Sequence, residues 1–240
     1  MPTAPEPSDS LPDNALVLAL DAASPIVSVA VGRGGSALAV RSVELRKSSE
    51  RLLGLIDEVL SEAGAGVRDV AAMVALAGPG SFTGLRVGLA TVLGCHQAIG
   101  VRAAAVPTLP VLALSSELET GTVWAVVDAI RGEWFAQPFR LAPGEAPEAL
   151  AEPRLLASDE LLAEAPETLV GFGLGRLPGE AGRRIVPAEL ASAALRLVAL
   201  SPPIWDAAGL TRPLYLRAPE VSEPRPRPPI GAGTSSGVTP

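Results

Sequence analysis

The sequence predicts an α/β protein made of two related halves, and three observations support this fold class. Short apolar runs separated by tight turns open the chain, which is typical of antiparallel strands. A nearly continuous apolar run over residues 70–77 is followed by a glycine-rich turn and then by a helical pattern. An apolar run that ends in an aspartate and a turn occurs twice, at Asp21 and at Asp128. We therefore expect an internal duplication, with less helix in the second half.

The first half reads as three strands, then a helix, a strand, a helix, a strand and a helix. The first helix is expected to open at Ser48, which can cap it, and to end before Gly64. Its predicted apolar face consists of Leu52, Leu53, Ile56, Val59, Leu60 and Ala63, with Leu55 outside the stripe. The expected strands cover residues 15–20, 26–31, 37–43, 70–77 and 102–106, and the expected helices cover 48–63, 83–99 and 108–117.

The second half repeats the opening pattern with less helix. Its expected strands are 122–127, 133–141 and 168–172, its expected helices are 158–164 and 187–200, and residues 143–153 read as a loop. The composition divides the chain into a disordered lead-in over 1–13, an N-terminal subdomain over 14–117, a C-terminal subdomain over 118–219 and a disordered Pro/Arg/Gly/Ser tail over 220–240.

The composition excludes several classes of function. A formal charge of −7 argues against independent tight binding to nucleic acid. Cys95 is the single cysteine and His96 the single histidine, so no intrachain disulfide and no site of several imidazoles or thiolates can form. The N-terminus lacks the pattern of a signal peptide, and no apolar run approaches the roughly 18 residues of a membrane span. We expect a cytoplasmic protein without a metal or cofactor.

The stretch around Gly80 has two interpretations. Strand, glycine-rich turn and helix together can point N–H groups at a phosphate. However, the stretch lacks the Gly-Lys-Ser/Thr ending of a P-loop and the G-x-S-x-G spacing of a nucleophile elbow. The interpretation favoured here is a structural motif that shapes a tight turn and close packing, made of Gly78, Pro79, Gly80, Ser81, Phe82, Thr83, Gly84 and Arg86.

The helix predicted over 83–99 is apolar nearly all round. Its only strongly polar residues after Leu85 are Arg86, His96 and Gln97, so more than one of its sides should be covered. The helix over 48–63 can cover part of it; the alternatives are a homodimer or a different partner. The interface residues predicted on this pair of helices are Leu52, Leu55, Ile56, Val59, Gly84, Val87, Gly88, Ala90 and Thr91.

The two turn aspartates are weak candidates for ligand binding. An aspartate at such a turn can hold Mg²⁺ through water, but Asp also commonly stabilises a turn by bonding its backbone. Asp21 is followed by two alanines rather than by the Gly and Thr/Ser cluster of a phosphate site, which favours the structural role there. Asp128, Arg131 and Glu133 form a dense charge group that can pair across the hairpin.

Five stretches in this order resemble the TsaB (YeaZ) family of tRNA threonylcarbamoyladenosine biosynthesis proteins. The most specific of them is the Gly-Pro-Gly-Ser-Phe-Thr-Gly-Leu-Arg run that begins at Gly78. The resemblance covers about residues 15–219. The five stretches are Leu18–Ala23, Ser49-Glu50, Gly78–Gly88, Asp128–Glu133 and Pro213–Arg217.

The resemblance implies an actin-like/sugar-kinase/Hsp70 (ribonuclease H-like) fold of two subdomains, the second smaller. It also implies a non-catalytic scaffold that binds TsaD, the catalytic paralogue, with TsaE joining the complex and tRNA bound only through it. That complex transfers threonylcarbamoyl to the adenosine beside the anticodon of tRNAs that read codons beginning with A. TsaD holds a metal with a His-x-x-x-His pair, which a chain with one histidine cannot form.

Two positions depart from the family pattern. Many members have His where this chain has Ser48, and many have Thr where this chain has Ala22. Both departures lead away from ligand binding. The alternative is a weak ATPase or a peptidase-like enzyme of the same fold, consistent with the turn aspartates and with older peptidase labels of the family.

Overall fold

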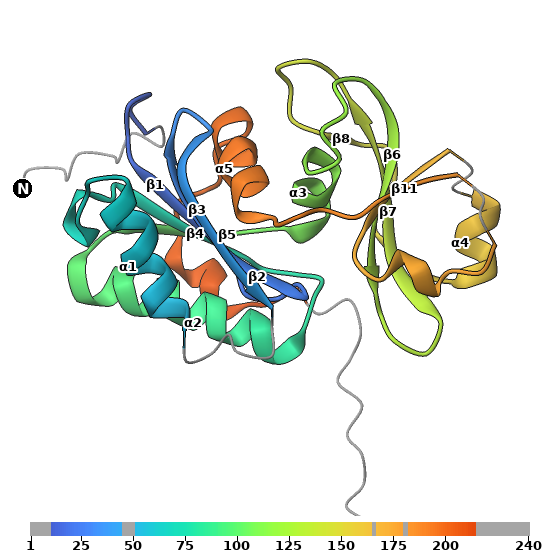
Figure 1. The fold of residues 1–240 in the computed structure, drawn as a ribbon, viewed down its shortest axis with the longest axis horizontal. Helices are drawn as coiled ribbons and strands as arrows, with labels where there is room; N and C mark the ends of the chain where they lie inside the picture. Colours follow the sequence, from blue (N-terminus) through green and yellow to red (C-terminus); the bar gives the residue numbers. More distant parts are fainter. Residues whose placement is uncertain (1–10, 45–50, 165–166, 180–181, 215–240) are drawn as a thin grey trace, which may run out of the picture.

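The computed structural model describes residues 11–44, 51–164, 167–179 and 182–214 (Figure 1). The predicted tail lies wholly outside the described residues, and so do the lead-in up to residue 10 and the expected helix opening at Ser48-Ser49-Glu50. Within the described ranges the chain forms two mixed sheets. No helix there is both long and apolar enough to cross a membrane.

The first sheet has the strand order β3-β2-β1-β4-β5. β1 pairs antiparallel with β2 and parallel with β4, and β4 is parallel to β5. Both β1 and β4 are buried along their whole lengths, as expected for apolar strands covered on two faces. The strands are β1 (Val17–Asp21), β2 (Ile26–Arg33), β3 (Ser36–Glu44), β4 (Ala72–Leu76) and β5 (Arg102–Val106).

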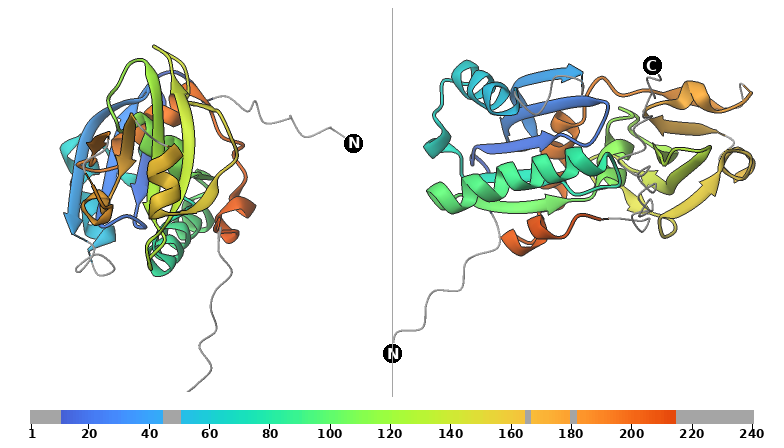
Figure 2. Two further views of the ribbon diagram at one scale, coloured as in Figure 1. Left: turned by 90° about the vertical axis from the view of Figure 1, so that its right-hand side faces the viewer. Right: turned by 90° about the horizontal axis from the view of Figure 1, so that it is seen from below.

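Helices cover both faces of this sheet because its side chains alternate between them. Leu18 and Leu20 point to the face covered by α1 (Leu52–Glu62) and α2 (Phe82–Ile99). Val17 and Ala19 point to the face covered by α3 (Thr108–Leu114) and α5 (Ala191–Leu200). Seen from below, α2 lies along the outside of the sheet, from the side of the second subdomain to the far end of the first (Figure 2).

The second sheet has the order β11-β10-β6-β7-β8, and β9 also pairs with β7. Its hairpin β6–β7 and its parallel strands β6, β10 and β11 repeat the arrangement of β1, β2, β4 and β5. This repetition confirms the predicted fold class of two related subdomains. Its elements are β6 (Gly121–Asp128), β7 (Glu133–Leu141), β8 (Glu148–Ala149), β9 (Arg154–Ala157), α4 (Ser158–Glu164), β10 (Thr168–Gly171), η3 (Leu174–Arg176) and β11 (Arg183–Ile185).

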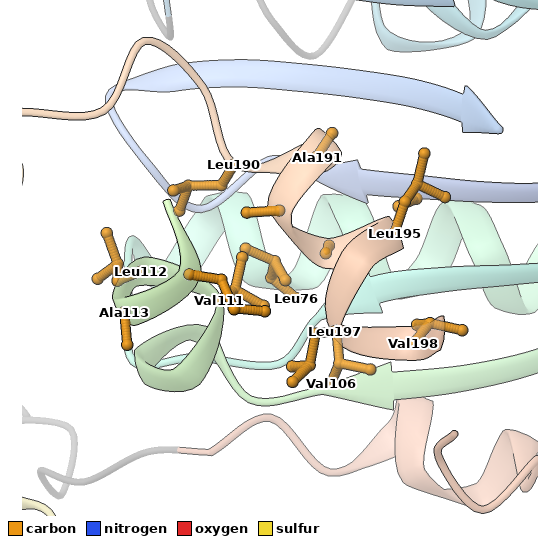
Figure 3. Packing of buried hydrophobic residues seen from close by; sticks show 14 of the residues in the cluster. Leu76, Val106, Val111, Leu112, Ala113, Leu190, Ala191, Leu195, Leu197 and Val198 are labelled. Atoms are coloured by element: carbon orange, nitrogen blue, oxygen red, sulfur yellow. The ribbon is translucent and has the colours of Figure 1, made fainter. Parts of the chain in front are cut away.

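The last described elements, α5 and η4 (Ala207–Thr211), lie on the first subdomain, which differs from the predicted boundary of 118–219. α5 packs on β1 and β2, and η4 packs on β5 and α2. α3 and α5 pack together in one apolar cluster (Figure 3). The cluster also includes residues of both sheets, so the two helices join the two subdomains through a common core. The boundary was missed because the apolar face of α5 does not reveal which sheet it covers.

The apolar face of α1 differs from the predicted stripe. Leu55 is 1% exposed and lies in the core, whereas Leu53 is 64% exposed. With 3.6 residues per turn, Leu55 lies on the same side as Leu52 and Val59, and Leu53 lies well round the helix from them. The strands β8, β9 and β11 were also missed, because segments of two to four residues carry almost no alternating pattern.

Candidate functional site

The turn between β4 and α2 is held from several directions by backbone hydrogen bonds. Thr108 N donates to Gly78 O over 2.9 Å, and Leu214 N donates to Ala77 O over 2.8 Å. Gly78 has a φ of +113°, a conformation that glycine alone adopts at low cost. The Gly78–Pro79 peptide bond is cis. The Ser81 hydroxyl accepts from Gly84 N over 3.3 Å and so caps α2.

The start of α2 is pressed against the turn that follows β1. Ser81 N donates to Ala23 O over 2.8 Å. A Cβ added at Gly84 would lie 2.0 Å from Ala22 O, and one at Gly80 would lie 2.8 Å from the Ala23 Cβ. Only glycine fits at these two positions, because real Cβ atoms essentially never come within 3.0 Å of such neighbours. The glycines thus allow the backbone at the start of α2 to lie directly against Ala22 and Ala23.

Asp21, at the end of β1, is fully buried beneath this contact. Its Oδ1 accepts from Ala23 N (2.8 Å) and Ser24 N (3.2 Å), while its Oδ2 has no hydrogen-bond partner among the described residues. Burial raises the pKa of the Asp21 carboxyl to about 6, and the negative charge of Glu189 also raises this pKa. The hydrogen bonds from the Ser24 hydroxyl and from the two N–H groups lower the pKa, but by less than burial raises it. Burial thus extends the pH range in which the Asp21 carboxyl is mainly neutral up to about pH 6.

Asp128, at the end of β6, lies in a more open setting. Its Oδ1 accepts from Ile130 N over 2.8 Å, and its Oδ2 forms an ion pair with Arg176 of η3. The Asp128 side chain is 21% exposed and that of Arg176 is 74% exposed. Ile130 and Arg131 have φ values of +67° and +59°, and the Ile130 side chain is 70% exposed. A β-branched residue in this conformation is strained.

The two aspartates thus occupy equivalent places in the two sheets, each with its own local partners. Among the described residues, no three His, Cys, Asp or Glu side chains gather in a way that could hold a metal ion. Sequence reasoning did not identify Arg176 or Glu189 as neighbours of the aspartates. Both lie far away along the chain, and no local motif marks them.

The predicted interface residues divide into buried and exposed sets. Leu52, Leu55, Ile56 and Val59 of α1 are at most 4% exposed and pack in the core, so they offer no surface to a partner. On α2, Gly84 and Gly88 face the sheet, where a Cβ at Gly88 would lie 3.0 Å from the Leu20 Cδ1. Val87 and Thr91 are half-buried, and Ala90 is exposed.

The exposed face of α2 carries little charge. It includes Ala90 on its middle turns, and the Arg86 guanidinium stacks 3.9 Å from the centroid of the Phe82 ring at its start. Arg86 is the only charged residue on this face. The exposed residues of α2 are Phe82, Thr83, Arg86, Ala90, Gly94, Gln97, Ala98 and Ile99.

Comparisons with known proteins point to one family. The family model described as TsaD, tRNA N6-adenosine threonylcarbamoyltransferase, matches residues 42–167. The chain is 29% identical over 147 residues to the tRNA threonylcarbamoyladenosine biosynthesis protein TsaB of Escherichia coli, and 33% identical over 135 residues to TsaB of Haemophilus influenzae. These matches cover 58% and 53% of this chain, and they span 64% and 55% of the two relatives.

A solved structure agrees with these matches over a larger share of the chain. YeaZ from Pseudomonas aeruginosa superposes with a TM-score of 0.69 at 26% identity, and the match covers 84% of this chain and all of the other. This chain therefore has the same fold as the YeaZ structure, in agreement with the two sheets described above. The chain belongs to the family whose model is described as TsaD, and it is similar to proteins of that family described as TsaB and YeaZ.

Proposed function

We propose that the protein is a non-catalytic partner of a TsaD-type subunit in a complex that modifies tRNA. The complex would transfer a threonylcarbamoyl group to the adenosine beside the anticodon, in the cytoplasm, with a TsaE-type protein as a further member. The proposal draws on the E. coli relative, described as a tRNA threonylcarbamoyladenosine biosynthesis protein, and on the family model, described as a threonylcarbamoyltransferase.

The observation that carries the proposal is the exposed face of α2. A surface helix of a globular protein normally presents charged and polar residues to solvent. Along its 18 residues α2 exposes a single charge, Arg86, and small or apolar residues such as Ala90 and Ala98. Small side chains let another helix approach closely, so this face fits a helical partner.

The turn that follows β1 supports a role without catalysis. The backbone of α2 occupies the space beside Ala22 and Ala23, and the Asp21 carboxyl is fully buried. An aspartate that positions a nucleotide-bound cation needs access to water and to the phosphates. The chain also has one histidine, which cannot form the His-x-x-x-His pair of the catalytic paralogue.

Co-purification with the TsaD-type protein of the same organism tests the proposal. Ala90→Arg places a long charged side chain on the exposed α2 face and should abolish co-purification while leaving the circular dichroism spectrum unchanged. Ala199→Arg on α5 is the matched control, because Ala199 is also an exposed helical alanine. Undiminished co-purification of the Ala90→Arg variant would overturn the placement of the interface.

The alternative of a weak ATPase is tested separately by calorimetry. The purified chain is titrated with ATP and Mg²⁺, and the proposal expects no saturable heat. Micromolar binding that disappears in Asp21→Ala would contradict the non-catalytic role. If the chain forms only a homodimer and ignores the TsaD-type protein, a homodimeric regulator replaces the proposal.

A further inference from the structure

A shallow groove of about 60 Å³ lies between the two subdomains. The first subdomain contributes two prolines and two leucines to its lining, and the second contributes one proline and one glutamine. The residues of the first subdomain come from the turn before α2, from the start of α3 and from the last described residue. In that order of subdomains, they are Pro79, Pro107, Leu109 and Leu214, and then Pro153 and Gln137.

The size and chemistry of this groove match one side chain rather than a ligand. Small-molecule sites usually measure about 300–1,000 Å³, so a nucleotide does not fit here. Among the described residues that line the groove none is charged, and Leu109 in its wall is 3% exposed. The polar side chain is that of Gln137, whose Nε2 donates to Ala151 O over 2.9 Å and whose amide oxygen can accept from a hydroxyl. An apolar side chain that ends in a hydroxyl therefore matches the groove.

The described chain ends at the rim of this groove. From η4 the backbone runs toward the second subdomain (Figure 2), and Leu214 N donates to Ala77 O over 2.8 Å. The Leu214 side chain lines the groove and is still 45% exposed. The next residue in the sequence is Tyr215, whose Cα lies about 3.8 Å from that of Leu214. A side chain attached at the rim meets the groove at a high effective concentration, which favours it over a separate molecule.

We propose that the side chain of Tyr215 covers this groove and joins the two subdomains. Its ring would pack on prolines of both subdomains, as aromatic rings and prolines pack in proline-recognition domains. Its hydroxyl would meet the Gln137 amide, and the ring would cover apolar surface of Leu214 that is otherwise exposed. This contact lies within one chain, so it goes beyond the proposed function and does not depend on a TsaD-type partner.

The single tyrosine of the chain provides a direct reporter of this contact. In full-length protein labelled with ¹³C only in tyrosine, the ring signals belong to Tyr215 alone, because the sequence has no other tyrosine. We expect nuclear Overhauser effects between the Tyr215 ring protons and proline ring protons of the groove. We also expect ring-proton shifts that differ from those of a short peptide with the sequence of residues 213–219.

Two pairs of variants test which residues make the contact. Pro153→Ala removes the proline that the second subdomain contributes, and it should shift the Tyr215 ring signals and remove their Overhauser effects to that residue. Pro203→Ala is the matched control, because Pro203 is also half-buried but does not line the groove. Tyr215→Ser should accelerate amide hydrogen exchange of the peptides that contain Gln137 and Pro153, measured by mass spectrometry. Val221→Ser, six residues further along the sequence, should leave that exchange unchanged.

Three results would overturn the proposal. The first is a set of Tyr215 ring shifts equal to those of the peptide, without Overhauser effects to the groove. The second is an unchanged Tyr215 spectrum in Pro153→Ala. The third is loss of the Overhauser effects on dilution of the protein, which would assign the ring to the groove of a second copy. All measurements use the purified chain alone, so their outcome is independent of whether the proposed function is correct.

Discussion

The two subdomains connect equivalent strands in different ways. In the first, α2 links β4 to β5 through 18 residues, and its first turn presses on the backbone after Asp21. In the second, the described part of the link between β10 and β11 contains only the three-residue η3. η3 supplies Arg176, which pairs with Asp128, and it leaves that carboxyl partly exposed.

The difference shows how one arrangement of strands acquires two roles. The long connection places the start of α2 against the turn that follows β1 and covers Asp21. The opposite side of α2 faces solvent. The short connection keeps the β6 turn near the surface, where Asp128 bonds to its own hairpin and to one arginine. The following predictions test this contrast, from the largest expected effect to the smallest.

Gly84→Ala should break the contact between α2 and the β1 turn. Its Cβ would lie 2.0 Å from Ala22 O, so the helix must shift, and we expect a loss of about 3 kcal/mol or more in the free energy of unfolding. Gly94→Ala is the matched control in the same helix, since a Cβ there meets nothing within 4 Å. It should stabilise by about 0.5–1 kcal/mol. Urea denaturation measures both, and equal effects would contradict the contact.

Asp21→Asn should change how stability depends on pH. The pKa of Asp21 in the folded state, about 6, lies above the ordinary aspartate value of 3.8. The folded state therefore binds more protons than the unfolded state between these two values, and Asp21 makes stability fall as the pH rises through this window. The cost at pH 7 is roughly 3 kcal/mol relative to the protonated form. The variant lacks this titration, so its stability relative to wild type should increase from pH 4 to pH 6 and then level off. A difference that stays constant with pH would contradict the burial of an ionisable Asp21.

Asp128→Ala and Arg176→Ala should separate the two bonds of the second aspartate. The alanine at 128 removes the acceptor for Ile130 N, for which we expect a loss of about 1 kcal/mol in unfolding free energy. Arg176→Ala removes only an ion pair whose arginine is largely exposed, and its expected cost is a few tenths of a kcal/mol. Thermal denaturation of both variants provides the comparison, and a larger effect of Arg176→Ala would reverse this ranking.

Ile130→Asn should stabilise the β6–β7 turn. Asparagine tolerates a φ of +67° better than a β-branched residue, and the exposed Ile130 side chain loses little burial, so a gain of about 1 kcal/mol is expected. Ile204→Asn is the control, because Ile204 is 84% exposed and its φ is not positive. If Ile130→Asn and Ile204→Asn change the free energy of unfolding by the same amount relative to wild type, the backbone of Ile130 is not strained.

Local patterns predicted most of the features on which the contrast depends. The β4 run, the glycine turn, the length of α2 and the two aspartates are encoded by neighbouring residues, and the structure places them accordingly. The return of α5 to the first sheet and the pairing of Arg176 with Asp128 depend on segments far apart in sequence. For the same reason the predicted interface included α1 residues such as Leu55 that the core buries.

Hydrogen exchange tests most directly the claim that the exposed face of α2 is the partner surface. Amide exchange of the purified chain is measured by mass spectrometry with and without the TsaD-type protein. We predict increased protection of peptides within residues 82–99, lost in the Ala90→Arg variant, and unchanged exchange in α5. Protection confined to the 128–133 turn or to β3, with α2 unchanged, would contradict the claim.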